Sequence, residues 1–282
     1  MKTVSCSPSQ VHYTELPPAN SLAPFVECIW MLQSDSNLFN NRELIIPGGR
    51  TEMIFNFGNP IHWIDSKDTS LIQTCYGSYF LGPRNRPFFI EQRGIINMVG
   101  VRFRHGGLAP FTTVPMNLLL NEVVPMDHLF GNEGDILTHR LHTSDKVTQK
   151  ILIEDFLMKR FQHLTCMRQT LHLISQVKQC AFGDHIKKIS EKSGVHYKKM
   201  ERIFSKYTGY NPKNFSRVIR FYSALQHMKK SSSSLTGIGL NNGYYDQPHF
   251  IRDFKAFTGK SPSQFHTENH TIANLLLQSQ HV

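Results

Sequence analysis

Short runs of β-forming residues, broken by turn signals, occupy the first hundred residues of the chain. Residues 51–57 form one such run, between Pro47-Gly48-Gly49 and Gly58-Asn59-Pro60, and residues 95–103 form another that ends before Gly106-Gly107. Branched and aromatic residues between glycine- and proline-rich turns are typical of strands. Several strands at this spacing predict a small β-barrel or sandwich.

The hydrophobic period changes to that of a helix after about Asp127. Apolar residues at helical spacing predict an amphipathic helical section over residues 133–163; they are Leu137, Leu141, Leu152, Phe156, Leu157 and Phe161. Such a stripe fits a buried core and the contact face of a dimer equally. The polar residues 162–169 predict a domain boundary.

An internal repeat fills the C-terminal part. The first copy carries Ile189, Gly194, Met200, Phe204, Gly209, Pro212 and Phe215, and the second carries Ile238, Gly243, Phe250, Phe254, Gly259, Pro262 and Phe265. Ile189 and Ile238 are 49 positions apart, whereas Phe204 and Phe254 are 50 apart, so one residue is inserted in the turn that follows the first glycine. One skeleton that recurs at a fixed period predicts two copies of one supersecondary unit.

Each copy has the pattern of a helix-turn-helix. In the first copy, a helix capped near Asp184 leads to a turn at Gly194, where positive φ is free of Cβ strain. The second helix is expected over residues 196–207, with a buried stripe of Met200, Ile203, Phe204 and Tyr207. In the second copy Asp246 caps the corresponding helix and Pro248 is tolerated in its first turn; the stripe there is Phe250, Phe254 and Phe257.

The opposite faces of these second helices are candidates for DNA contact. They carry Lys198, Lys199, Arg202 and Lys206 in the first copy, and Gln247, His249, Arg252 and Lys255 in the second. A solvated charged face would explain any single lysine. The same basic bias in both copies, with residue types that bond base edges and phosphates, favours DNA contact, above all for Arg202 and Arg252. Lys206, Lys255 and Lys260 are expected on backbone phosphates.

The segment between the two copies, residues 212–228, keeps helical periodicity after an initial proline and predicts one connecting helix. A rigid helix would fix the distance between the two recognition helices, and successive faces of the major groove lie about 34 Å apart. The four serines at 231–234 predict a short flexible break.

The charge of the chain is concentrated in the same C-terminal part. Residues 1–170 hold 15 basic and 15 acidic residues, whereas residues 171–282 hold 16 and 6, so the whole net charge of +10 lies in the second group. A basic module attached to a neutral one indicates a polyanion binder. Neither a membrane-spanning segment nor the apolar core of a secretion signal is recognisable, which predicts a cytoplasmic protein without membrane contact.

A chain of 282 residues is long enough for two cores. We expect a β-rich sensing or dimerising domain with C-terminal helices at residues 1–165, a DNA-binding domain at 166–268, and a tail at 269–282. The fold class is thus α+β and multidomain. Cys6, Cys28, Cys75, Cys166 and Cys180 are scattered, without the paired spacing of zinc sites, and are expected to be reduced thiols.

The run from Gly243 to Lys255, Gly-Tyr-Tyr-Asp-Gln-Pro-His-Phe-Ile-Arg-Asp-Phe-Lys, closed by Thr258-Gly259-Lys260-Ser261-Pro262-Ser263-Gln264-Phe265, resembles the signature of the AraC/XylS family of bacterial transcription regulators. With the first copy and the connecting helix, the resemblance covers about residues 171–268. It implies binding of double-stranded promoter DNA through two adjacent major grooves, and usually activation of transcription by contact with RNA polymerase. Ser190 and Gly239 depart from the alanine usual in the first helix of each unit.

The N-terminal part is similar to the companion domain of one branch of this family, through residues 13–19 and 22–30, Gly82-Pro83-Arg84 and Gly100-Val101-Arg102-Phe103. That branch implies a cupin-like β-barrel, which would bind a small-molecule effector, serve in a homodimer, or do neither. Arg102 and Arg104, with Trp30 and Trp63, are candidates for an anion or aromatic pocket, against the alternative of salt-bridged or exposed arginines.

Two other classes of protein compete with this interpretation. Cupin-like barrels include metal enzymes, but His62 and His105 lie far apart with no neighbouring ligand at metal spacing, so we expect no enzyme, no metal and no cofactor. An architectural nucleic-acid binder would also carry a charge of +10. Sequence discrimination distinguishes these two classes, because a regulator binds its own site more tightly than other DNA by a factor of roughly 10³ or more.

Overall fold

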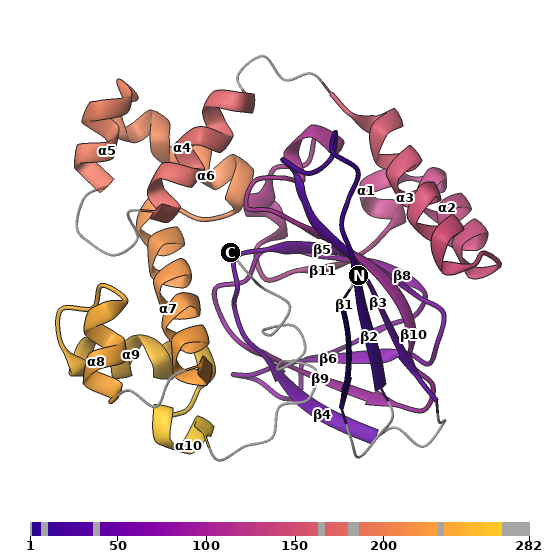
Figure 1. Ribbon diagram of the computed structural model, residues 1–282, viewed down its shortest axis with the longest axis horizontal. Helices are drawn as coiled ribbons and strands as arrows, with labels where there is room; N and C mark the ends of the chain where they lie inside the picture. The colour runs from indigo at the N-terminus through magenta and orange to yellow at the C-terminus, as the bar shows by residue number, and fades with distance from the viewer. Residues whose placement is uncertain are drawn as a thin grey trace.

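The computed structural model describes residues 2–6, 11–35, 40–162, 167–179, 186–230 and 234–266. The expected tail at 269–282, the cap at Asp184 and the serines at 231–233 lie outside these residues. Figure 1 shows a β-rich N-terminal domain with helices α1–α3 on one side and the helices of the C-terminal part on the other. The α+β multidomain class expected from the sequence is confirmed.

Two antiparallel sheets form the N-terminal domain. The larger runs in the order β1-β2-β3-β10-β5-β8-β11 and the smaller in the order β4-β9-β6-β7. The strands of the larger sheet are β1 (Lys2–Cys6), β2 (Val11–Leu16), β3 (Val26–Ser34), β10 (Asn97–Phe103), β5 (Thr51–Asn56), β8 (Ser78–Leu81) and β11 (Val123–Pro125). Those of the smaller sheet are β4 (Asn40–Ile45), β9 (Phe88–Arg93), β6 (Ile61–Asp65) and β7 (Ile72–Cys75). Both runs singled out in the sequence, 51–57 and 95–103, contain strands at the centre of the larger sheet.

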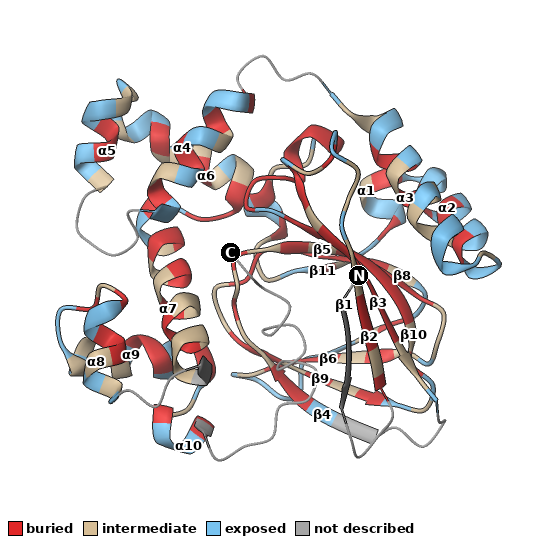
Figure 2. Cartoon of the chain, in the orientation of Figure 1, coloured by how far each residue is buried: buried red, intermediate tan, exposed pale blue. Residues whose placement is uncertain are grey.

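The central strands β3 and β10 of the larger sheet are buried on both faces over most of their length. In β3, Ile29 and Met31 join the core under the helices, whereas Trp30 and Leu32 join the core between the two sheets. The alternation follows the two-residue period of a strand. Figure 2 shows the resulting band of buried residues along β3, β10 and β5.

The helical section predicted at residues 133–163 consists of two helices, α2 (Asn132–His142) and α3 (Lys146–Arg160), preceded by the short α1 (Asp127–Phe130). Asp145 caps α3, because its side chain accepts hydrogen bonds from the amides of Val147 and Thr148. The predicted apolar stripe packs into the core of the N-terminal domain, so it is core and not a free face.

The helices of the C-terminal part are α4 (Met167–Gln179), α5 (Ile186–Ser193), α6 (Tyr197–Thr208), α7 (Pro212–Lys230), α8 (Leu235–Asn241), α9 (Gln247–Thr258) and α10 (Pro262–His266). They share one core that includes Leu173 and Ile174 of α4 and the apolar faces of both repeats. The single connecting helix expected between the two copies is confirmed as α7.

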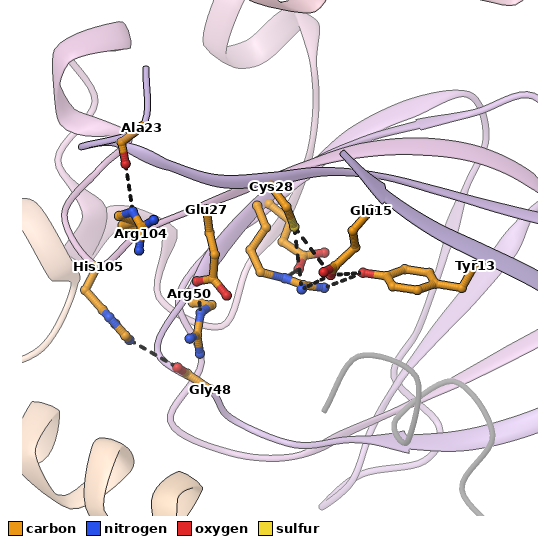
Figure 3. Close-up of polar contacts among 11 residues, drawn as sticks. Tyr13, Glu15, Ala23, Glu27, Cys28, Gly48, Arg50, Arg104 and His105 are labelled. Carbon is orange, nitrogen blue, oxygen red and sulfur yellow. Dashed lines mark hydrogen bonds and ion pairs between the residues drawn. The ribbon is translucent and has the colours of Figure 1, made fainter. Parts of the chain in front are cut away.

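The two domains touch through the end of α6 and the start of α7. The hydroxyl of Tyr210 donates to the backbone oxygen of Arg84 at 2.5 Å, and the ring of His105 stands edge-on to Phe215 with centroids 5.2 Å apart. His105 also lies 3.3 Å from the oxygen of Gly48, as Figure 3 shows. Burial, with Arg50 and Lys178 nearby, holds the pKa of His105 well below its usual value, so the ring is neutral at this contact.

Candidate DNA-binding surface

The two repeated skeletons fold into two helix-turn-helix units, α5–α6 and α8–α9. Every apolar position of the skeleton is buried: Ile189, Met200, Phe204 and Phe215 in the first unit, and Ile238, Phe250, Phe254 and Phe265 in the second. The glycines of the turns, Gly194 and Gly243, have φ of 65° and 76°. The left-handed backbone there requires glycine, because a Cβ would be strained. The repeat predicted from the sequence is therefore confirmed as a structural repeat.

The second helix of each unit is bounded by matching caps. His196 and Asp246 stand at the N-caps of α6 and α9, where the side chains accept hydrogen bonds from the amides of Lys198 and His249. Gly209 and Gly259 end the two helices with φ of 78° and 75°. The extra residue of the second copy lies in the turn before α9, as its longer path from Gly243 to Gln247 requires.

Ser190, which replaces the alanine usual in the family, closes the turn of the first unit. Its hydroxyl donates to the backbone oxygen of Val195 at 2.6 Å, and the residue is buried. We expect Ser190→Ala to lower the free energy of unfolding by about 0.5–1.5 kcal/mol, the usual net contribution of one hydrogen bond. Urea denaturation followed by circular dichroism measures this, with exposed Ser21 changed to alanine for comparison; an unchanged midpoint for Ser190→Ala would contradict it.

The charged side chains predicted to face outward on α6 do so. Lys198, Lys199, Arg202 and Lys206 are all exposed, and on α9 Arg252 and Lys255 are exposed as well. Within the described part of the chain, neither Arg202 nor Arg252 has a hydrogen-bond or ion-pair partner. Both guanidinium groups are therefore available to acceptors of another molecule.

Gln247 and His249 are turned less far outward than the sequence pattern predicts. The side-chain oxygen of Gln247 accepts from the hydroxyl of Thr236 at 3.0 Å, which ties it to α8. The ring of His249 stands edge-on to Tyr244 at 5.1 Å, and its Nε2 lies 4.0 Å from a carboxylate oxygen of Asp253. The helical period places both residues on the outer face, but these neighbours draw their side chains to its edge.

A buried carboxylate that sequence reasoning missed fixes α9 against the connecting helix. Asp253 is 3% exposed and accepts from Arg217 of α7 at 2.7 Å and 3.2 Å. Arg220 of α7 lies 3.8 Å from its other oxygen and stacks over Tyr244 at 4.8 Å. Asp253 falls among the apolar positions of α9, and this place in the helical pattern was the sequence signal that its carboxylate is buried. The network sets how α9 is presented beside α7.

The helix α7 joins the two units as a rigid spacer. It has 19 residues and, at 1.5 Å per residue, is about 28 Å long. Val218, Phe221, Ala224 and Leu225 on one face are buried in the core that both units share. The two recognition helices are thus held on one framework.

The residues proposed for an N-terminal pocket divide into two groups. Arg102 is buried and bonded to Glu52 at 2.6 Å and to Glu15 at 3.1 Å, so it is salt-bridged, and Arg104 donates to the backbone oxygen of Ala23. Glu15, Tyr13 and Cys28 gather around that cluster in Figure 3. Trp30 and Trp63 line a cavity between the two sheets, and Arg102 belongs to the wall of the same cavity.

Neither a metal-ligand cluster nor a helix able to cross a membrane occurs within the described ranges. The thiols of Cys28 and Cys75 are free and buried. Burial raises the pKa of both, that of Cys75 to about 11, which leaves them protonated and unreactive at neutral pH. The side chains of Cys6, Cys166 and Cys180 lie outside the described residues.

Comparison with known proteins assigns both parts of the chain. Residues 189–268 match a helix-turn-helix domain, and residues 14–125 match a domain of unknown function, DUF6597. An uncharacterized HTH-type transcriptional regulator of Haemophilus influenzae is 26% identical over 181 residues, which are 63% of this chain and 60% of that relative. The match thus spans about three-fifths of the relative's length.

Solved structures of ToxT from Vibrio cholerae are also similar. One at 12% identity covers 80% of this chain and 97% of ToxT with a TM-score of 0.47; another, bound to an unsaturated fatty acid, covers 83% and 95% with a TM-score of 0.44. The match over residues 189–268 confirms the helix-turn-helix domain that the sequence resemblance implied, and this domain is joined to an N-terminal part that matches DUF6597.

Proposed function

We propose that the chain is a sequence-specific DNA-binding regulator of transcription, which inserts α6 and α9 into adjacent major grooves of promoter DNA. The observation that carries the proposal is the pair of unpartnered arginines, Arg202 and Arg252, at equivalent places on the two recognition helices. Arginine reads guanine through two parallel hydrogen bonds in the major groove. Two such readers on one rigid framework suit a bipartite site.

The remaining candidate residues have supporting roles in this proposal. Lys198 and Lys199 lie in the first turn of α6, and Gln247 and His249 in that of α9, where recognition helices contact base edges and phosphates. Lys206 and Lys255 lie farther along and bind backbone phosphates, which positions the protein without reading sequence. Together they supply the salt-dependent part of the affinity.

The N-terminal domain is proposed to control this activity. It binds a small-molecule effector, and exposed apolar residues of α2 and α3, Ile136, Val147, Ile151 and Met158, offer a contact face for a homodimer. We further propose that the chain activates transcription by contacting RNA polymerase. Gel filtration with light scattering tests the dimer, and a promoter fusion read with and without the chain tests the sign of regulation.

We expect Arg202→Ala and Arg252→Ala each to weaken binding of the specific site by about 1–3 kcal/mol, because each removes a bidentate contact to a base. Binding of random duplex DNA should change much less. Fluorescence anisotropy with labelled duplexes measures both affinities, and Arg140→Ala, an exposed arginine of α2, is the matched control for lost charge. Equal losses on specific and random DNA would show that the arginines contact only phosphate.

A further inference from the structure

A cavity of about 150 Å³ lies between the two sheets of the N-terminal domain. Its walls are mostly apolar and include Trp30, Trp63, Ile54, Ile61 and Ile90. Gly100 of β10 makes room for one wall, because a Cβ there would lie 2.3 Å from the indole ring of Trp30. A dry cavity of about this size holds one benzene ring, so the space suits a small molecule with a compact apolar body.

Arg84 is the exceptional side chain of this cavity. It is 5% exposed, and among the described residues its two terminal nitrogens, Nη1 and Nη2, have no hydrogen-bond partner. Its guanidinium stacks over Trp63 at 4.1 Å and Phe88 at 5.0 Å, but no carboxylate of the described chain pairs with it. Buried arginines are normally paired, since an unpaired buried charge is costly.

The other charges of the cavity wall are already satisfied. Arg102 is held by Glu52 and Glu15, and Arg50 by Glu27. Burial lowers the pKa of Arg84 to about 10, so it stays charged at neutral pH. Within the described residues, the buried side-chain amide of Gln92, another wall residue, also lacks partners for both of its polar atoms. The wall of the cavity therefore contains one cation without a carboxylate partner and one amide without hydrogen bonds, both buried behind its apolar surface.

We propose that this cavity binds a small monocarboxylate with a compact apolar body, whose carboxylate bonds to Nη1 and Nη2 of Arg84. A carboxylate matches the fork of two guanidinium nitrogens and neutralises the buried charge. The apolar walls favour a monoanion with a hydrocarbon body over a phosphate, which would need many more donors. This proposal rests on the proposed role of the N-terminal domain in binding an effector, and it specifies the chemical class of that effector.

Two contacts connect residues of this cavity to the DNA-binding part of the chain. Tyr222 of α7 forms part of the cavity wall and lies under Arg50, whose guanidinium is 5.4 Å from its ring. The backbone oxygen of Arg84 accepts the hydroxyl of Tyr210, just after α6. A ligand held by Arg84 fills a cavity whose wall includes Tyr222, so it stabilises the arrangement in which α7 packs against the N-terminal domain.

The test uses the full chain without DNA, so that its outcome is independent of sequence recognition. Benzoate, cyclohexanecarboxylate and hexanoate are titrated beside their neutral amides, with the fluorescence of Trp30 and Trp63 as readout, since both tryptophans line the cavity. We expect saturable binding of at least one carboxylate, about ten- to a hundredfold tighter than its amide, as hydrogen bonds to a charged group provide. Equal affinity for acid and amide, or no binding by any of the six, would overturn the proposal.

Variants of Arg84 test whether this side chain causes the preference for the carboxylate over the amide. Arg84→Met keeps a long side chain without charge and should abolish the preference for the acid over the amide, whereas Arg84→Lys should retain part of it. The melting temperature without ligand shows whether each variant folds. A folded Arg84→Met that still prefers the acid would overturn the role of Arg84. Failure of the proposed DNA recognition would appear separately, as loss of sequence preference in DNA binding with carboxylate binding intact.

Discussion

Replacement of Phe254 by alanine is expected to destabilise the C-terminal domain by about 3–5 kcal/mol, the usual cost of removing a buried phenylalanine. Phe254 is fully buried at the centre of an aromatic cluster. Its ring meets Phe221 of α7 at 5.5 Å, Phe250 at 5.6 Å and Phe265 at 5.5 Å, each edge to face. One side chain thus joins α9 to the connecting helix and to α10, and its loss leaves a cavity where three elements meet.

The two domains can be followed separately during denaturation. Both tryptophans of the chain, Trp30 and Trp63, lie in the N-terminal domain, so their fluorescence reports that domain, while far-ultraviolet circular dichroism reports mainly helices. Phe254→Ala should shift the circular dichroism transition strongly and the fluorescence transition less. Phe254→Leu, which keeps most of the volume, is the matched control. A Phe254→Ala protein with both transitions unchanged would rule out the packing described for α9.

Arg102→Met is expected to destabilise the N-terminal domain by about 3–5 kcal/mol, because it removes the cation from a buried ionic cluster. Arg102 faces Glu52 on one neighbouring strand and Cys28 on the other in the register of the sheet, and its side chain bonds to Glu52 and Glu15. Burial opposes the charge on Arg102, but Glu52 and the other groups around it outweigh burial and keep its pKa above the usual value. Without it, two carboxylates would remain uncompensated.

Tryptophan fluorescence during urea denaturation measures this loss. The double variant Arg102→Met with Glu52→Gln should recover part of the stability, since one of the stranded carboxylates becomes neutral. Arg104→Met is the control, because Arg104 is exposed and, in the part of the chain that the structure describes, bonds to the backbone oxygen of Ala23 and to no carboxylate. If Arg102→Met were no less stable than Arg104→Met, the cluster would contribute nothing to the fold.

Much of the C-terminal architecture could be predicted from the sequence, because its determinants are local. Glycines at fixed intervals mark turns that need positive φ, and the apolar positions between them follow the helical period. The spacing of Ile189, Gly194 and Phe204 repeats in Ile238, Gly243 and Phe254, and both sets adopt the same conformation. Runs of β-forming residues between turn signals likewise predicted β5 and β10.

The features that escaped prediction depend on pairs of residues far apart in the chain. Asp253 and Arg217 are 36 positions apart, so neither helix alone says which cation the carboxylate meets. The sequence shows Arg84 only as part of a short motif. Its lack of a carboxylate partner depends on the fold, because the sheets place the nearby carboxylates beside Arg102 and Arg50. Gln247 and His249 lie on the predicted face, yet neighbours on α8 and in the preceding turn draw their side chains aside.

The two recognition helices, α6 and α9, are proposed to read two halves of one DNA site. The most direct measurement is selection from a random duplex pool by the full chain, followed by sequencing, repeated with Arg202→Ala and with Arg252→Ala. We expect the unaltered chain to recover two half-sites about one helical turn apart, and each variant to lose information in a different half. Recovery of no motif, with an affinity that only falls as salt rises, would contradict the claim and identify a non-specific binder.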